Sequence, residues 1–182
     1  MRFASFAIAV SFAFLAGCGR TQTSQNESAA GYSAKSGPTN GLVMLAVKPL
    51  PRDEALKIMH ERHEGMEATG KAAKAAAREL QGSSPNLGIV RSSAHSINDF
   101  APKIANLVPP GTGPEMGKTG AKPEIWQNPK DFAAKAHEFQ VAAQAFDAAA
   151  AGSDVGSIKL RFGQMMQTCK ACHDKYRMEM HH

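Results

Sequence analysis

Apolar residues recur at helical spacing in four separate stretches of the chain. The first stretch runs from Pro51 to Leu80, and at about 3.6 residues per turn its apolar stripe contains Leu56, Met59, His63, Met66, Gly70, Ala73 and Ala77. A second stretch fits residues 86–100, a third fits 128–151, and a fourth fits 155–180. The pattern predicts four amphipathic helices.

The connections between these helices indicate the architecture. No stretch alternates apolar and polar residues as a half-buried strand does. Two of the connections are short, and only the proline- and glycine-rich loop 108–129 is long. Hydrophobic residues make up 43% of the chain and aromatic residues only 7%, and the many alanines favour helices. We therefore expect an all-α fold, an antiparallel up-down four-helix bundle.

The N-terminal segment reads as an export signal. Arg2 is followed by an apolar run over 3–16, which is short for a membrane span. The segment ends in Leu15-Ala16-Gly17-Cys18, which resembles the bacterial lipobox, although ordinary secretory cleavage with an incidental Cys18 is the alternative. We expect a lipoprotein signal peptide at 1–17, a flexible polar tether at 18–41 and the bundle at 42–182. The protein would be periplasmic, held to a membrane by lipid on Cys18.

The chain's chemistry is concentrated in one motif near its C-terminus. Cys169-Lys170-Ala171-Cys172-His173 has the C-x-x-C-H spacing by which c-type haem is attached. Two thiols one helical turn apart can add to both vinyl groups on one edge of the porphyrin, and the next residue offers an imidazole to the iron. A Cys169–Cys172 disulfide is a weaker alternative because of the tight turn that it would need. A thioredoxin-like redox pair would need a βαβ setting and a zinc site would need a second ligand pair, and the sequence shows neither.

Position and flanking residues carry a resemblance to the cytochrome c′ family. The haem motif lies on the last helix, continues as "CHDKYR", and is preceded by "KPEIWQN" with Trp126 just before the third helix. The resemblance covers the chain from about residue 50 onward. It implies one covalent haem c, His173 as the proximal iron ligand, and Trp126 at the haem-side turn. Arg177 would pair with a haem propionate or simply end the helix in solvent.

The sixth iron position decides the function that the resemblance implies. Gas-binding members of the family place an apolar side chain there, whereas low-spin relatives place a methionine on the first helix. The segment "LKIMHERHEGMEATGKAAKA" resembles the low-spin branch, which implies Met59 as the distal ligand. His63, one turn further on the same stripe, is one alternative. Met66 is a weaker one, for which "RHEGM" is aligned with Arg62 in the family's basic position, and an open iron is a fourth possibility.

These observations predict a monohaem c-type cytochrome that carries single electrons with a His/Met-ligated, low-spin haem. The alternative is a haem protein with an open or labile sixth position that binds nitric oxide or carbon monoxide, and a third possibility is a structural haem subunit. No residue is needed as acid, base or nucleophile, so we do not expect an enzyme. The expected partners are redox proteins and, in a homodimer, a second copy of this chain. The net charge of +5 comes without an arginine-rich arm, so nucleic acid is not expected.

Overall fold

The computed structural model describes residues 49–179. The predicted boundaries at 17/18 and 41/42, and Cys18 itself, lie outside this range. Six helical elements follow one another: α1 Arg52–Gln81, α2 Leu87–Phe100, the 3₁₀ helix η1 Ala101–Leu107, α3 Glu124–Gln127, α4 Pro129–Ala150 and α5 Val155–Tyr176. The four long helices confirm the predicted all-α bundle. None of the described helices has the length and apolar character needed to cross a membrane.

Local sequence signals set the helix starts. The side chain of Asn86 accepts hydrogen bonds from the amides of Gly88 and Ile89 at the start of α2. Asp154 does the same for Gly156 at the start of α5. These caps satisfy amides that have no partner within their own helix. Pro129 opens α4, where its fixed φ and missing N–H cost nothing.

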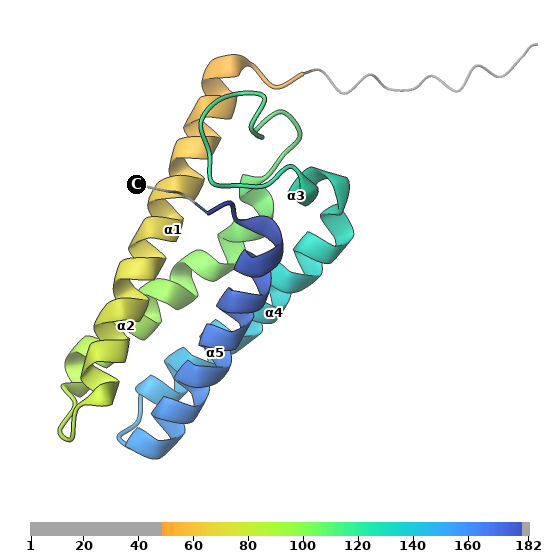
Figure 1. Ribbon diagram of the computed structural model, residues 1–182. Coiled ribbons are helices and arrows are strands. Elements are labelled where there is room, and N and C mark those ends of the chain that lie inside the picture. Colours follow the sequence, from red (N-terminus) through yellow and green to blue (C-terminus); the bar gives the residue numbers. More distant parts are fainter. Residues whose placement is uncertain (1–48, 180–182) are drawn as a thin grey trace, which may run out of the picture. The chain divides into compact units, whose positions relative to one another are not determined.

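The helices pack as two pairs with one open side. α1 packs on α2, α4 packs on α5, and α2 packs on α4, while η1 fills in against α1, α2 and α4. α1 and α5 form no packed interface, and they stand apart in Figure 1. The fully buried side chains lie mainly where α2, α4 and α5 meet: Val90, Ala94, Ile97, Ala143, Phe146, Ile158 and Met165.

Most positions of the buried stripe on α1 lie one residue earlier in the chain than predicted. Its buried members are Ala55, Met59, Arg62, Ala76 and Leu80. Leu56 is exposed instead, and the side chain of His63 is 70% exposed. The predicted stripe left out Arg62, whereas the fold buries this arginine and supplies partners for its donors.

Two further differences concern the loop and the last helix. The predicted loop 108–129 contains the short helix α3, and η1 extends the chain beyond α2 in a tighter coil that has Pro102 near its start. α5 ends at Tyr176 rather than near residue 180, because Arg177 is extended and pairs antiparallel with Ala121. The loop is thereby tied to the end of α5.

Candidate haem site

The two cysteines of the motif lie one turn apart on α5, and both are partly buried against the core. Both are free thiols in the structure. Burial, reinforced by Cys172, raises the pKa of Cys169 to about 11, and burial also raises the pKa of Cys172. A redox-active pair needs a lowered thiol pKa, so these thiols do not have the character of a thioredoxin-like site.

His173 follows Cys172 directly on α5 and is exposed. Tyr176, three residues further along and about 60° away around the helix, packs against Phe132 of α4. Desolvation lowers the pKa of His173, and the charge of Arg177 adds to that effect. A neutral imidazole is the form that binds a metal.

The C-terminal turn of α5 is fixed on two sides. Tyr176 is 3% exposed, packs edge-on against Phe132 at 5.3 Å between ring centroids, and donates from its hydroxyl to Asp131. On the other side, the amide of Lys122 donates to the carbonyl of Tyr176 at 2.9 Å, and the amide of Met178 donates to Gly120 at 2.8 Å. These contacts hold the turn that carries His173.

Arg62 crosses from α1 into the long loop and is only 7% exposed. Its guanidinium donates to the carbonyl of Leu107 at 2.7 Å, to the carbonyl of Thr112 at 2.9 Å, and to the hydroxyls of Thr112 and Thr119, each at 3.3 Å. Burial lowers the pKa of Arg62, and the charge of Glu115 opposes that shift. No carboxylate of the described chain forms a salt bridge with it. A buried guanidinium without an ion-pair partner suits a site that accepts an anionic group.

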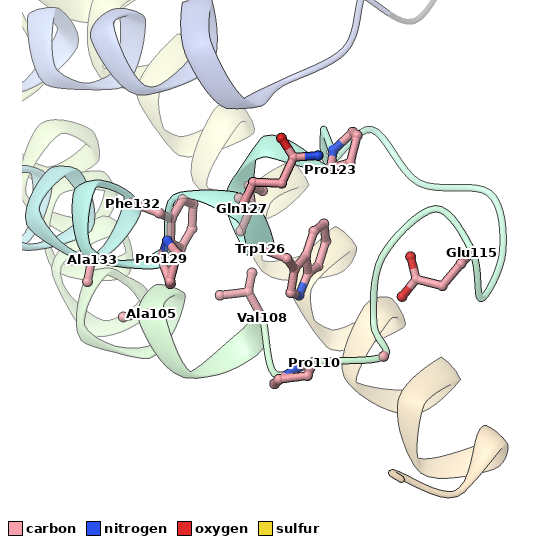
Figure 2. A pocket seen from close by; sticks show the side chains of 12 residues that line it. Ala105, Val108, Pro110, Glu115, Pro123, Trp126, Gln127, Pro129, Phe132 and Ala133 are labelled. Carbon is pink, nitrogen blue, oxygen red and sulfur yellow. The ribbon is translucent and has the colours of Figure 1, made fainter.

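Trp126 lies next to Arg62 at the end of the loop. The Arg62 guanidinium carbon is 5.6 Å from the ring centroid, and the indole Nε1 donates to the carbonyl of Pro109 at 3.0 Å. Trp126 also lines a cavity of about 520 Å³ together with Val108, Pro129 and Phe132 (Figure 2). The predicted Trp126 thus joins α1, the loop and the start of α4.

The candidate distal residues on α1 lie in different surroundings. The methyl group of Met59 is directed at the loop, since a Cβ built on Gly117 would lie 3.9 Å from Met59 Cε. Met66 lies seven residues further, about 10 Å along the helix, and packs against the core while partly exposed. His63 points outward and lies 4.0 Å from Glu67.

The side of α1 that faces away from α2 has room beside it. Gly65 lies against the ring of Phe100, whereas a Cβ on Gly70 would meet no atom within 4 Å. The two glycines are about 140° apart around α1. A pair of thiols one turn apart, a neutral imidazole, a buried unpaired cation and an open flank on α1 together fit an anionic porphyrin between α1 and α5.

Sequence reasoning missed two parts of this site. Arg62 was only aligned with a basic position of the family, and its burial was not predicted. The hydrogen bond between Tyr176 and Asp131 was not predicted either. The spacing of "RHEGM" was the only signal for Arg62. Nothing in the sequence pairs positions 131 and 176, because that contact depends on how α4 and α5 align.

The family model for Cytochrome C′ matches residues 57–177. The chain belongs to the cytochrome c′ family. Proteins of this family bind one covalent haem c, which confirms the predicted cofactor, and they are periplasmic haem-binding proteins.

Individual relatives agree with this assignment. Cytochrome c′ from Allochromatium vinosum is 37% identical over 95 residues, which are 50% of this chain and 62% of that protein. The crystal structure of cytochrome c′ from Thermochromatium tepidum has a TM-score of 0.65 and 31% identity, and the match covers 71% of this chain and 98% of that one. Another solved cytochrome c′, with 31% identity and a TM-score of 0.64, shows ligand-controlled dimer dissociation.

The predicted function, a low-spin electron carrier with His/Met ligation, is wrong. The relatives are cytochromes c′, and one solved structure with the same fold, at 24% identity and a TM-score of 0.61, is the nitric oxide complex of a mutant of cytochrome c′ from Alcaligenes xylosoxidans. Binding of a gas requires an iron whose sixth position is free or easily vacated. The methyl group of Met59 packs toward the loop in this structure.

Proposed function

We propose that this protein binds nitric oxide or carbon monoxide at the sixth position of its haem iron. Cys169 and Cys172 would form the thioethers, and His173 would bind the iron on the proximal side. The haem supplies the iron at which a diatomic gas binds. The observation that carries the proposal is the packing of Met59 toward the loop at Gly117, which occupies the methionine that would otherwise close the site.

The residues around the haem would position it and shield it from water. Tyr176, through Asp131, holds the turn of α5 that orients the imidazole of His173. Arg62 offers a positive charge to a propionate while keeping the loop closed over this end of the bundle. Met66, which is partly buried on α1 and packs against the core, would limit the space on the distal side.

The experiment is a titration of the reduced, haem-loaded protein with nitric oxide, followed by visible absorption. We expect stoichiometric binding in the wild type and in Met59→Ala, because Met59 would not compete for the iron. A wild-type protein that ignores the gas, combined with a Met59→Ala variant that takes it up, would overturn the proposal. Met166→Ala, on the exposed surface of α5, is the matched control.

Location and assembly belong to the same proposal. Export to the periplasm with a lipid on Cys18 would place the gas-binding domain at a membrane surface on the 18–41 tether. Fractionation of cells that express the full chain tests this, because Cys18→Ser should move the protein from the membrane to the soluble fraction. A homodimer is proposed by analogy with the relative whose dimer dissociates under ligand control, and analytical ultracentrifugation tests it.

A further inference from the structure

The cavity beside Trp126 is apolar and opens to the surface of the bundle. Phe132 is buried on its inner side, whereas Ala133 is exposed at its edge. Among the described residues that line it, only Glu115 and Gln127 are polar. Its lining comes from η1, the loop, α3 and the start of α4, so it is distinct from the space between α1 and α5. An apolar, aromatic-lined cavity of this size is typical of a binding site.

A strongly apolar run precedes the described part of the chain. Residues 42–47 read Leu-Val-Met-Leu-Ala-Val and follow the polar stretch 19–41 directly. Burial stabilises each large aliphatic side chain by about 1.5–3 kcal/mol, so we expect this run to pack against the bundle. The sequence prediction that the bundle begins at residue 42 includes the run, although α1 begins only at Arg52.

Two prolines keep α1 from extending backwards into this run. Pro49 and Pro51 each disfavour the helical conformation of the residue before them. Pro51, with φ −55° and ψ 141°, already stands outside the helix. The chain therefore enters α1 from an extended segment, which covers about 3.3 Å per residue.

The start of α1 lies beside one end of the cavity. The Arg52 Nη1 atom is 3.9 Å from the sulfur of Met116, and Met116 directly follows Glu115. Glu115 lies at one end of the cavity and Ala133 at the other (Figure 2). Residues 42–51 span roughly 30 Å when extended, so the apolar run can enter the cavity from the Glu115 end.

Charge at that end agrees with this direction of entry. Lys48 directly follows the apolar run, and Glu115 is exposed where the run would enter. With residues 42–47 inside the cavity, Lys48 would lie near the Glu115 carboxylate. An exposed ion pair adds little stability, but opposite charges at the entrance favour this orientation of the run over the reverse one.

We propose that residues 42–47 of this chain bind in the cavity beside Trp126. The bound run would shield Trp126 and Val108 from water, and the free tether behind Cys18 would then end at residue 41. This inference is independent of gas binding, because Cys169, Cys172 and His173 do not line the cavity.

The test is amide hydrogen exchange of the haem-loaded full chain, followed by mass spectrometry. We expect the amides of residues 43–47 to exchange at least about tenfold more slowly than those of residues 22–36. Ala133→Glu places a charge in the cavity and should remove this protection. Ala134→Glu is the matched control, because Ala134 is exposed on the same turn of α4 but does not line the cavity. An acidic residue near the start of a helix is well tolerated, so both variants should fold.

The same measurement distinguishes the other possible partners of the run. Equal exchange of residues 43–47 and 22–36 in the wild type would overturn the inference. Protection that persists in Ala133→Glu would do so as well, since the run would then bind elsewhere. Protection that disappears on dilution to the monomer would assign the run to a second copy of the chain, and protection that is absent in Cys18→Ser would assign it to the membrane.

A variant of the run itself keeps the test decisive if Ala133→Glu does not take up haem. Val43→Asp combined with Leu45→Asp should speed the exchange of the amides of residues 108–112, because the cavity loses its cover. Ala29→Asp combined with Ala34→Asp adds the same charge within the predicted tether and should leave that exchange unchanged. Equal exchange at residues 108–112 in the two double variants would contradict binding of the run in the cavity.

Discussion

α5 and α1 would contact opposite faces of the same haem, yet their sequences reveal their roles very differently. On α5 the haem-binding groups lie within five consecutive residues, because two thioethers and an iron ligand must share one helical turn. On α1 no short motif exists, and the residues that matter are defined by what the fold places against them: the loop over Arg62 and Met59, and the ring of Phe100 against Gly65. Covalent attachment of haem requires residues close together in the chain and therefore leaves a motif in the sequence. The distal face is formed by residues that only the tertiary fold brings together.

We expect the largest effect from replacing the two haem-binding cysteines of α5. Cys169→Ala combined with Cys172→Ala removes both thioethers, so we expect complete loss of covalent haem. Haem staining after denaturing electrophoresis measures this directly. Met166→Ala on the same helix should keep its stain, and a double variant that still carries covalent haem would refute the assignment of the two cysteines.

On the α1 side, Arg62→Met should have the next largest effect. It leaves the carbonyls of Leu107 and Thr112 without their donor, and we expect the free energy of unfolding to fall by about 3 kcal/mol. Urea denaturation measures the loss. Arg78→Met, exposed in the last turn of α1, should stay within about 0.5 kcal/mol of wild type, and equal stability of the two variants would contradict the account of Arg62.

Two glycines on α1 offer a matched pair. Gly65→Ala would force its methyl group into the ring of Phe100, so we expect a loss of about 1–3 kcal/mol. Gly70→Ala meets no protein atom and should stabilise the haem-free protein by up to about 1 kcal/mol through helix propensity. Thermal unfolding of both haem-free variants checks this, and an effect of the same sign at both positions would argue against the open flank.

The smallest effect concerns acid stability at the end of α5. Hydrogen bonds from Lys175 and then Tyr176 lower the pKa of Asp131 in the folded protein. A lowered folded-state pKa means that the stabilisation is present above the unfolded pKa and is lost as the pH falls through the folded value. Between pH 5 and about 3 the melting temperature of wild type should therefore fall more steeply than that of Asp131→Asn. Parallel acid profiles would contradict this.

The sequence was sufficient for the fold because helices of this length carry a strong periodic signal. The four long helices, the haem motif and the family resemblance at Trp126 could all be predicted from residues close together in the chain. The face of α1 could not be predicted as well: Arg62 reads as a surface residue until Leu107, Thr112 and Thr119 are known to surround it. The contact of Met59 with the loop could not be predicted for the same reason, since Gly117 lies 58 positions away in sequence.

The spin state of the haem reports whether the sixth position of the iron is open. We would record the visible absorption and electron paramagnetic resonance spectra of the purified, haem-loaded protein with no gas added, oxidised and reduced. We expect a five-coordinate, high-spin haem in the wild type, unchanged in Met59→Ala. A low-spin haem that becomes high-spin in Met59→Ala would show that Met59 closes the sixth position.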